Sequence, residues 1–260
     1  MIDYSLTMSK GKPFVFFLHG WGGSKESFYV VKNHIATICN MVFVSFSGFG
    51  QSAEPKYPFS VEDYAKELKE VVDEVAKKQK IILVCHSFGA RVAVKFASFY
   101  PEIVSKIMIV DGAGIKPRRS IAYHFKVLRY KTLKKKVENK KLDKKVLEKY
   151  GSSDYKMLSG VMKQTFVRVV NEDLKKYYKS LSCPVLLFWG KKDKDTPLYM
   201  AKKIKKLVKN SALIVIKGAG HFSYLDDRIT FIEVLKEFIL NVWLFFNNVR
   251  YLVDFIILII

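Results

Sequence analysis

Short apolar runs recur along this chain, each closed by residues that favour a turn, and they restrict its fold more than any other feature. The runs occupy residues 14–18, 41–46, 80–85, 107–110, 185–189 and 212–216. An uninterrupted apolar run of this length predicts a strand that is buried on both faces of a sheet. We therefore expect a central sheet with a covering layer on each side.

Helical patterns lie between these runs. Residues 61–78 place apolar side chains on one stripe with acids and lysines opposite, and Pro101 stops a second helical pattern over 88–100. A third helix is expected over 224–240. The alternation of strand and helix predicts an α/β protein with a mostly parallel central sheet flanked by helices.

The alternation stops between residues 115 and 180, where the pattern is helical and the charge is high. This stretch holds 20 Lys and Arg against six Asp and Glu, a net charge of +14 out of +21 for the whole chain. We therefore predict a core over 1–114 and 181–240 with a basic helical cap inserted at 115–180. Residues 241–260, of which fifteen are apolar, form a separate C-terminal tail.

The composition excludes some classes of protein and favours others. Half of the 260 residues are apolar, which excludes general disorder. The net charge favours an anionic partner, but no nucleic-acid-binding module is recognised, so no nucleic-acid partner is expected. The plainer interpretation of the basic cap is a solvated helix surface. The alternative is attraction to an acidic substrate or to an anionic membrane surface, which the basic cap and the apolar tail would contact together.

The cysteines and the N-terminus bear on the compartment. Cys39, Cys85 and Cys183 are widely spaced and form no CxxC pair, so neither a zinc site nor a disulfide framework is indicated. Residues 1–12 carry no apolar core of signal-peptide length. These features predict a cytoplasmic protein, and the membrane alternative would place it at the inner face of the membrane.

Ser87 lies where the third predicted strand meets a helix, in the sequence Cys85-His86-Ser87-Phe88-Gly89. A sharp turn there would project the hydroxyl above the sheet, and it requires small residues two positions before and after the serine. Gly89 meets this requirement fully and Cys85 meets it in part. The N-terminus of the following helix would favour negative charge that develops at the serine.

A serine needs a base and an orienting acid to become a nucleophile. His221 follows the last predicted strand in a glycine-rich loop and is the candidate base. Asp193 follows the preceding strand in Gly190-x-x-Asp193 and is the favoured acid. Two alternatives remain open: Asp195, which we read as a cap of the next helix, and Asp111 after the strand 107–110.

An oxyanion hole needs two backbone N–H donors near the serine. We predict the amides of Phe88, directly after Ser87, and of Trp21, in the loop after the first apolar run. His19 and His86 are expected to brace the loops beside the site, where Gly20 allows close approach of the backbone.

Five motifs in this order resemble the α/β-hydrolase fold superfamily over residues 14–240. They are His19-Gly20-Trp21-Gly22-Gly23, Ser47-Gly48-Phe49-Gly50-Gln51-Ser52, Cys85-His86-Ser87-Phe88-Gly89, Gly190-x-x-Asp193 and Gly220-His221. The resemblance implies a helical cap at 115–180. The chain departs from the superfamily at Cys85, which replaces the usual first glycine of the elbow, and at Ser45-Phe46-Ser47-Gly48, which replaces Asp-x-Pro-Gly.

The predicted function is that of a serine hydrolase with a Ser87-His221-Asp193 triad, which cleaves a hydrophobic small-molecule ester or related acyl substrate through an acyl-enzyme. No metal or organic cofactor is required by this chemistry. One alternative is a membrane-surface lipid hydrolase of the lysophospholipase or monoacylglycerol-lipase type. The other is a non-catalytic binding protein on the same fold, with the basic cap as its contact surface.

Overall fold

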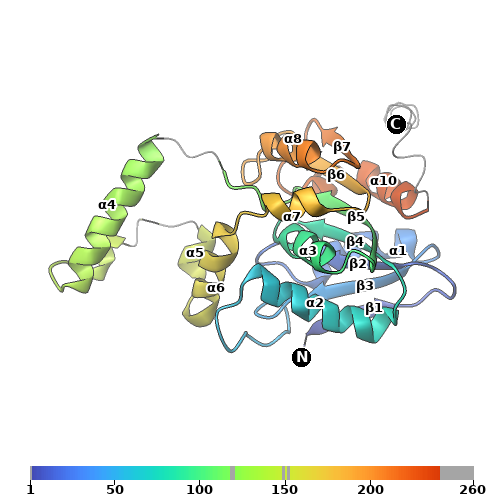
Figure 1. Ribbon diagram of the computed structural model, residues 1–260, viewed down its shortest axis with the longest axis horizontal. Coiled ribbons are helices and arrows are strands. Elements are labelled where there is room, and N and C mark those ends of the chain that lie inside the picture. The colour runs from blue at the N-terminus through green and yellow to red at the C-terminus, as the bar shows by residue number, and fades with distance from the viewer. Residues whose placement is uncertain (1, 118–120, 148–149, 151–152, 241–260) are drawn as a thin grey trace.

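The computed structural model describes residues 2–117, 121–147, 150 and 153–240, and its centre is a seven-stranded sheet (Figure 1). The strands are β1 (Asp3–Thr7), β2 (Phe14–Leu18), β3 (Asn40–Ser45), β4 (Ile81–His86), β5 (Val104–Val110), β6 (Val185–Gly190) and β7 (Ser211–Ile216). Their order is β1-β3-β2-β4-β5-β6-β7, and every neighbouring pair is parallel except β1 with β3. The predicted α/β class with a mostly parallel sheet flanked by helices is confirmed.

Helices cover both faces of this sheet. They are η1 (Lys25–Val31), α1 (Lys32–Ile35), α2 (Val61–Ala76), α3 (Phe88–Phe99), α8 (Leu198–Leu207), α9 (Ser223–Asp226) and α10 (Arg228–Leu240). Alternate residues of each strand face opposite layers. Phe16 therefore packs with the layer of α2, α3 and α8, while Phe17 packs with η1, α1 and α10. Burial on both faces explains why the central strands are apolar throughout.

Helix α2 shows how a local sequence fixes an element. The Ser60 hydroxyl accepts from the Asp63 amide while the Asp63 side chain accepts from the Ser60 amide, so the two residues form a capping box. The apolar stripe from Val61 onward is buried against the sheet, as its spacing predicts. Lys77 adopts a left-handed conformation and ends the helix.

Two features differ from the sequence-based expectations. The first strand identified from the sequence was residues 14–18, but β1 precedes it and pairs antiparallel with β3 at the sheet edge. It is half-buried, so it lacks the continuous apolar run of the central strands. The prediction of a single helix over 224–240 is wrong, because the helix is interrupted at Asp227, between α9 and α10. The Asp227 carboxylate accepts from the Thr230 amide and so begins a new helix, α10.

The segment between β5 and β6 is helical. It holds α4 (Ile121–Glu138), η2 (Lys144–Leu147), α5 (Ser153–Met157), α6 (Gly160–Asn171) and α7 (Lys175–Ser180). Figure 1 shows α4 well away from the sheet, whereas α6 and α7 lie against the body of the molecule. Met162 of α6 and Tyr178 of α7 belong to the same buried cluster as α2 and α3. The division into core and cap at 115 and 180 therefore stays a prediction.

The apolar tail predicted at 241–260 lies outside the described residues. Across the rest of the chain that the structure describes, we find no helix with the length and apolar character needed to traverse a bilayer.

Candidate active site

Ser87 lies at the turn between β4 and α3, with φ 47° and ψ −106°. This is a strained conformation for a residue with a side chain, and it persists only where the surroundings impose it. Ser87 is also the N-cap residue of α3, so the first N–H groups of that helix lie beside its hydroxyl. The predicted sharp strand-to-helix turn is thus present at this serine.

The residues around Ser87 show why the turn needs small side chains. A Cβ atom at Gly89 would lie closer than 3.0 Å to the backbone oxygen atoms of Leu18 and His19, so α3 could not approach β2 with a larger residue there. Cys85, which replaces the usual glycine on the other side, is accommodated because its thiol is fully buried and donates to the Met108 carbonyl at 3.3 Å. Burial raises the pKa of this thiol well above its ordinary value, which argues against a reactive cysteine.

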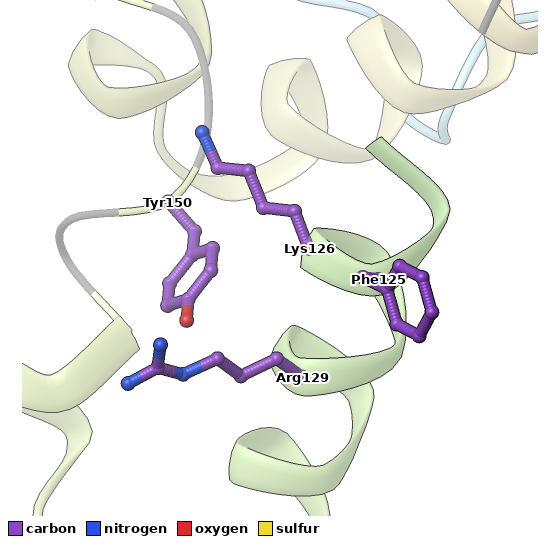
Figure 2. Close-up of a pocket in the computed structure, with 4 residues that line it drawn as sticks. All are labelled: Phe125, Lys126, Arg129 and Tyr150. Atoms are coloured by element: carbon purple, nitrogen blue, oxygen red, sulfur yellow. The ribbon is translucent and has the colours of Figure 1, made fainter. Parts of the chain in front are cut away.

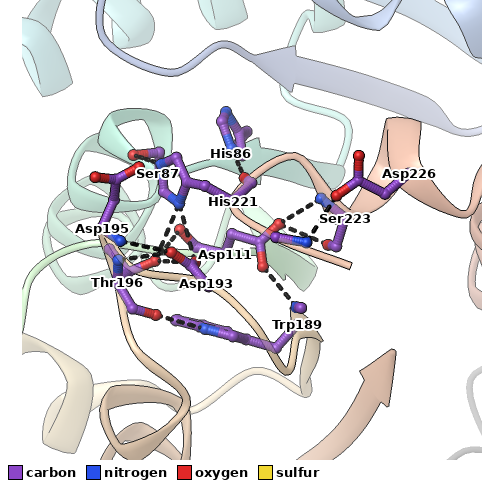
Figure 3. Close-up of polar contacts among 12 residues, drawn as sticks. His86, Ser87, Asp111, Trp189, Asp193, Asp195, Thr196, His221, Ser223 and Asp226 are labelled. Carbon is purple, nitrogen blue, oxygen red and sulfur yellow. Dashed lines mark hydrogen bonds and ion pairs between the residues drawn. The ribbon is translucent and has the colours of Figure 1, made fainter. Parts of the chain in front are cut away.

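His221 bridges Ser87 and Asp193 (Figure 3). Its Nε2 lies 3.0 Å from the Ser87 Oγ, and its Nδ1 lies 2.9 Å from the Asp193 Oδ2. The three residues come from the ends of β4, β6 and β7, which meet at the carboxyl edge of the sheet because these strands are parallel. This contact order matches a nucleophile, a base and an orienting acid.

Asp193 is held by its own loop. Its Oδ1 accepts from the amides of Asp195 and Thr196 at 2.8 and 2.9 Å, and its Oδ2 accepts from the Thr196 hydroxyl at 2.6 Å. Thr196 was not singled out from the sequence. The spacing Asp193-x-x-Thr196 is typical of an aspartate that accepts from the amides two and three residues later in the chain, and this local signal could have identified Thr196.

The pKa values of His221 and Asp193 move in opposite directions. Burial lowers the pKa of His221, but the hydrogen bond and the charge of Asp193 outweigh burial and raise it above the ordinary 6.5. Burial raises the pKa of Asp193, but the hydrogen bonds from His221 and Thr196 outweigh this and lower it below its ordinary value. An ionised carboxylate beside a basic imidazole is the arrangement that stabilises an imidazolium when the serine loses its proton.

The two alternative acids occupy other positions. Asp195 is exposed, and the N-cap position of α8 belongs to Pro197, so the reading of Asp195 as the helix cap is wrong. Asp111 is fully buried and accepts from the Gly190 amide, the Ser223 amide and the Ser223 hydroxyl. The Asp111 carboxylate thereby ties together the loops that carry Asp193 and His221.

Two further histidines brace the site. The His19 ring donates from Nδ1 to the Gly20 carbonyl at 2.7 Å and accepts from the Phe46 amide at 3.1 Å. His86 donates from Nε2 to the His221 carbonyl at 2.8 Å. Burial lowers the pKa of His19 to about 4 and that of His86 to about 3, so both rings are neutral near pH 7. A Cβ at Gly20 would approach the His86 Nδ1 to 2.6 Å.

A cavity of about 530 Å³ opens above Ser87 and His221. Its walls include the aromatic side chains of Trp21, Phe88 and Phe166, and the Trp21 ring lies 5.3 and 5.0 Å from the other two. The structure gives the amides of Trp21 and Phe88 no acceptor within the described residues, which leaves both available to an oxyanion. Their role as oxyanion donors remains a prediction.

Asp193, Asp195 and His221 form a cluster whose ligand-type atoms lie within 4.8 Å of one another. The Asp193 oxygens already accept from two amides, a hydroxyl and the His221 ring. The cluster is thus explained by the hydrogen bonds within the triad loop, and we do not assign a metal to it.

The comparisons with known proteins identify the family of the chain. A family model described as the alpha/beta hydrolase fold matches residues 13–144 and 140–228. The chain therefore belongs to the alpha/beta hydrolase fold family, and its class is that of the hydrolases. The family membership that the sequence motifs predicted is confirmed.

Individual relatives are distant but cover nearly the whole chain. A pimeloyl-[acyl-carrier protein] methyl ester esterase of Aliivibrio fischeri is 26% identical over 255 residues, which span 91% of this chain and 96% of the relative. A proline iminopeptidase of Saccharolobus solfataricus is 24% identical and covers 87% of this chain and 84% of its own length. The solved structure of an esterase from Exiguobacterium antarcticum superposes with a TM-score of 0.73 at 21% identity, covering 92% and 96% of the two chains.

Proposed function

We propose that this protein is a serine hydrolase that cleaves an ester or related acyl substrate through a Ser87-His221-Asp193 triad. The observation that carries the proposal is the continuous hydrogen-bond chain from the Ser87 hydroxyl through the His221 ring to the Asp193 carboxylate. The cavity above it, with aromatic walls, supports a substrate with an apolar portion.

The mechanism follows from the position of each group. The Ser87 Oγ attacks the carbonyl carbon while its proton passes to the His221 Nε2, and Asp193 stabilises the imidazolium. The amides of Trp21 and Phe88 bind the negative oxygen of the tetrahedral intermediate. Collapse of the intermediate breaks the bond to the leaving group, which takes the proton from His221 and leaves an acyl group on Ser87. Water then attacks this acyl-enzyme with the same base, which releases the acid and regenerates the serine.

The relatives support acyl transfer as the chemistry. Those described above are an esterase, a methyl ester esterase and a proline iminopeptidase, and each is named for hydrolysis at a carbonyl carbon. They differ in substrate, so they support the reaction type and leave the acyl group and leaving group of this protein to experiment.

Labelling with a fluorophosphonate probe tests the proposal directly. We expect the folded wild-type protein to be labelled, since a serine that an adjacent base activates attacks the phosphorus, displaces fluoride and becomes phosphonylated. Ser87→Ala should abolish labelling. Ser27→Ala is the matched control, because Ser27 also lines the cavity but its hydroxyl accepts from the Ser24 amide, and none of the described contacts joins it to a histidine, so the variant should still label. Absence of labelling in folded wild-type protein would contradict the enzymatic proposal and favour the non-catalytic binding protein.

A second candidate, a lipid hydrolase that works at an anionic membrane surface, is favoured by one observation on α4. Phe125 and Leu128 are 69% and 66% exposed, on a helix whose described residues otherwise carry many lysines. A hollow of about 510 Å³ lies beside them, lined by Phe125, Lys126, Arg129 and Tyr150 (Figure 2). Exposed apolar side chains among cations are the combination that binds the surface of an anionic bilayer.

A further inference from the structure

Arg91 lines the same cavity as Ser87 and His221. It lies on α3 four residues after Ser87, which is about one helical turn along the helix. Its side chain is buried, with the residue only 7% exposed. A cation in this position faces whatever substrate occupies the cavity.

The protein contacts of Arg91 are to carbonyl groups. Its Nη1 donates to the Glu172 carbonyl at 2.9 Å and its Nη2 to the Val170 carbonyl at a long 3.4 Å, both at the C-terminal end of α6. A guanidinium has five N–H donors in a planar fork. Two carbonyls at a helix end supply only a partial negative charge, so the cation is incompletely compensated.

The two carboxylates whose charges act on Arg91 are paired with other cations. Glu172 forms an ion pair with Lys95, and Asp173 forms one with Lys175. Within the part of the chain that the structure describes, no carboxylate forms an ion pair with Arg91. The charges of Glu172 and Asp173 act on Arg91 only from a distance, so the cavity contains a buried guanidinium with no carboxylate in direct contact within the described chain.

We propose that Arg91 binds an anionic group of the substrate, and that the substrate is an ester that also carries a carboxylate, joined to the scissile group by a short apolar segment. This inference rests on the proposed function and specifies its substrate class. The planar carboxylate matches the fork of the guanidinium, and the aromatic walls contact the apolar segment. Arg91 is thus a specificity-determining residue for the proposed reaction.

Lys95 provides a matched control. It lies on α3 one turn beyond Arg91, is only 4% exposed, and also contacts Glu172 at the end of α6. It is absent from the lining of the cavity. If Arg91 served only to hold α6 on α3, then removing Arg91, like removing Lys95, would change kcat/KM equally for anionic and neutral esters.

Two pairs of esters test the proposal, and each pair differs only in a terminal carboxylate. The first pair places it in the acyl group: 4-nitrophenyl hemiglutarate against 4-nitrophenyl pentanoate. The second pair places it in the alcohol: the acetate of 4-hydroxybutanoate against butyl acetate. We expect wild-type kcat/KM to favour the anionic member of at least one pair by about tenfold or more.

Each variant is judged by the ratio of kcat/KM for the anionic ester to kcat/KM for the neutral ester. A loss of folded protein lowers both values equally and leaves the ratio unchanged, so the ratio reports on substrate binding. Arg91→Gln should lower this ratio by about tenfold or more, and Arg91→Lys should restore part of it, since lysine keeps the charge but lacks the fork. Lys95→Gln should keep the wild-type ratio. A wild-type preference for the neutral ester in both pairs would overturn the proposal, as would equal changes of the ratio in Arg91→Gln and Lys95→Gln.

Failure of the proposed function would be recognised separately. If wild-type protein cleaves neither pair and resists the fluorophosphonate probe, then the serine-hydrolase proposal fails, and the anion site is tested by thermal unfolding with glutarate. Glutarate should raise the Tm of wild type and of Lys95→Gln but not of Arg91→Gln. No increase in the wild-type Tm under these conditions would overturn the anion site as well.

Discussion

Asp193 and His221 are each defined by a local motif, which is why the sequence predicted both of their positions. Asp111 is different, because its contacts join segments far apart in the chain: its carboxylate accepts from the Ser223 amide and hydroxyl, 112 residues away. No pattern within a window of ten residues contains such a contact. Sequence therefore placed Asp111 only among alternative acids, whereas in the structure its carboxylate fixes the loops of the other two residues.

The raised pKa of His221 predicts how activity depends on pH. The imidazole must be neutral to accept the proton of Ser87, so activity should fall as the pH drops through a pKa above the ordinary 6.5. We expect the acidic limb of kcat/KM, measured between pH 4 and 9 on a neutral 4-nitrophenyl ester, to have its midpoint above 6.5. A midpoint at or below this value would contradict the assignment of His221 as the base held by Asp193.

Two variants test the source of that shift. Asp193→Asn should move the limb to lower pH and reduce kcat by about 10⁴-fold, as loss of the orienting acid does in other triads. Asp195→Asn removes a neighbouring charge that makes a smaller contribution to the pKa of His221, and it should move the limb less and largely preserve kcat. Equal effects of the two variants would mean that Asp195 shares the role of acid.

At the scale of elements, the path of α3 depends on Gly89. Its missing side chain allows the helix to pass over the backbone of β2 at Leu18, and a Cβ atom would collide with that carbonyl. The sequence predicted the turn at Ser87 because the small residues that it requires, Cys85 and Gly89, lie within two positions of the serine. It did not reveal β1, whose half-buried pattern is typical of an edge strand, nor the break at Asp227, which results from one aspartate capping α10.

Gly89→Val tests the fit of α3 against β2. We expect it to destabilise the fold by about 3 kcal/mol or more, since neither the backbone of β2 nor that of α3 can move away without disrupting the sheet. Urea unfolding followed by circular dichroism measures the change. Gly218→Val is the control, because a Cβ there meets nothing within 4 Å, and it should cost far less. Similar stabilities of the two variants would show that the close approach is relaxed in solution.

At the scale of the whole molecule, the sheet and the order of its functional residues were predictable, since buried parallel strands have an unmistakable apolar pattern. The arrangement between β5 and β6 was not. The charge of this segment predicted that it is basic and helical. It did not predict that α6 joins the main core through residues such as Met162, or that α4 lies away from the sheet. The buried side chains of α6, Met162, Thr165 and Val169, recur every three to four residues and so define one buried face, but this spacing does not identify the element that the face packs on.

Vesicle flotation tests whether α4 contacts lipid. We expect the full-length protein to float with vesicles rich in phosphatidylserine but not with pure phosphatidylcholine, because each surface lysine adds about 1 kcal/mol near an anionic bilayer. Phe125→Ser with Leu128→Ser should weaken flotation. Ile229→Ser on α10, where the residue is also 69% exposed, should leave it unchanged. Flotation of a chain that ends at Leu240 measures how much residues 241–260 contribute to membrane binding. Absence of flotation by the full-length protein would reject the membrane candidate.

The loops that carry the acid and the base touch along their backbones. The Lys192 amide donates to the Ala219 carbonyl at 2.9 Å, and a Cβ at Gly190 would collide with the carbonyl of Gly220. Neither loop can shift without pushing the other. Asp193 and His221 therefore keep their relative positions. The helices between β5 and β6 can vary in sequence and position without separating the proton acceptor from the carboxylate that supports it.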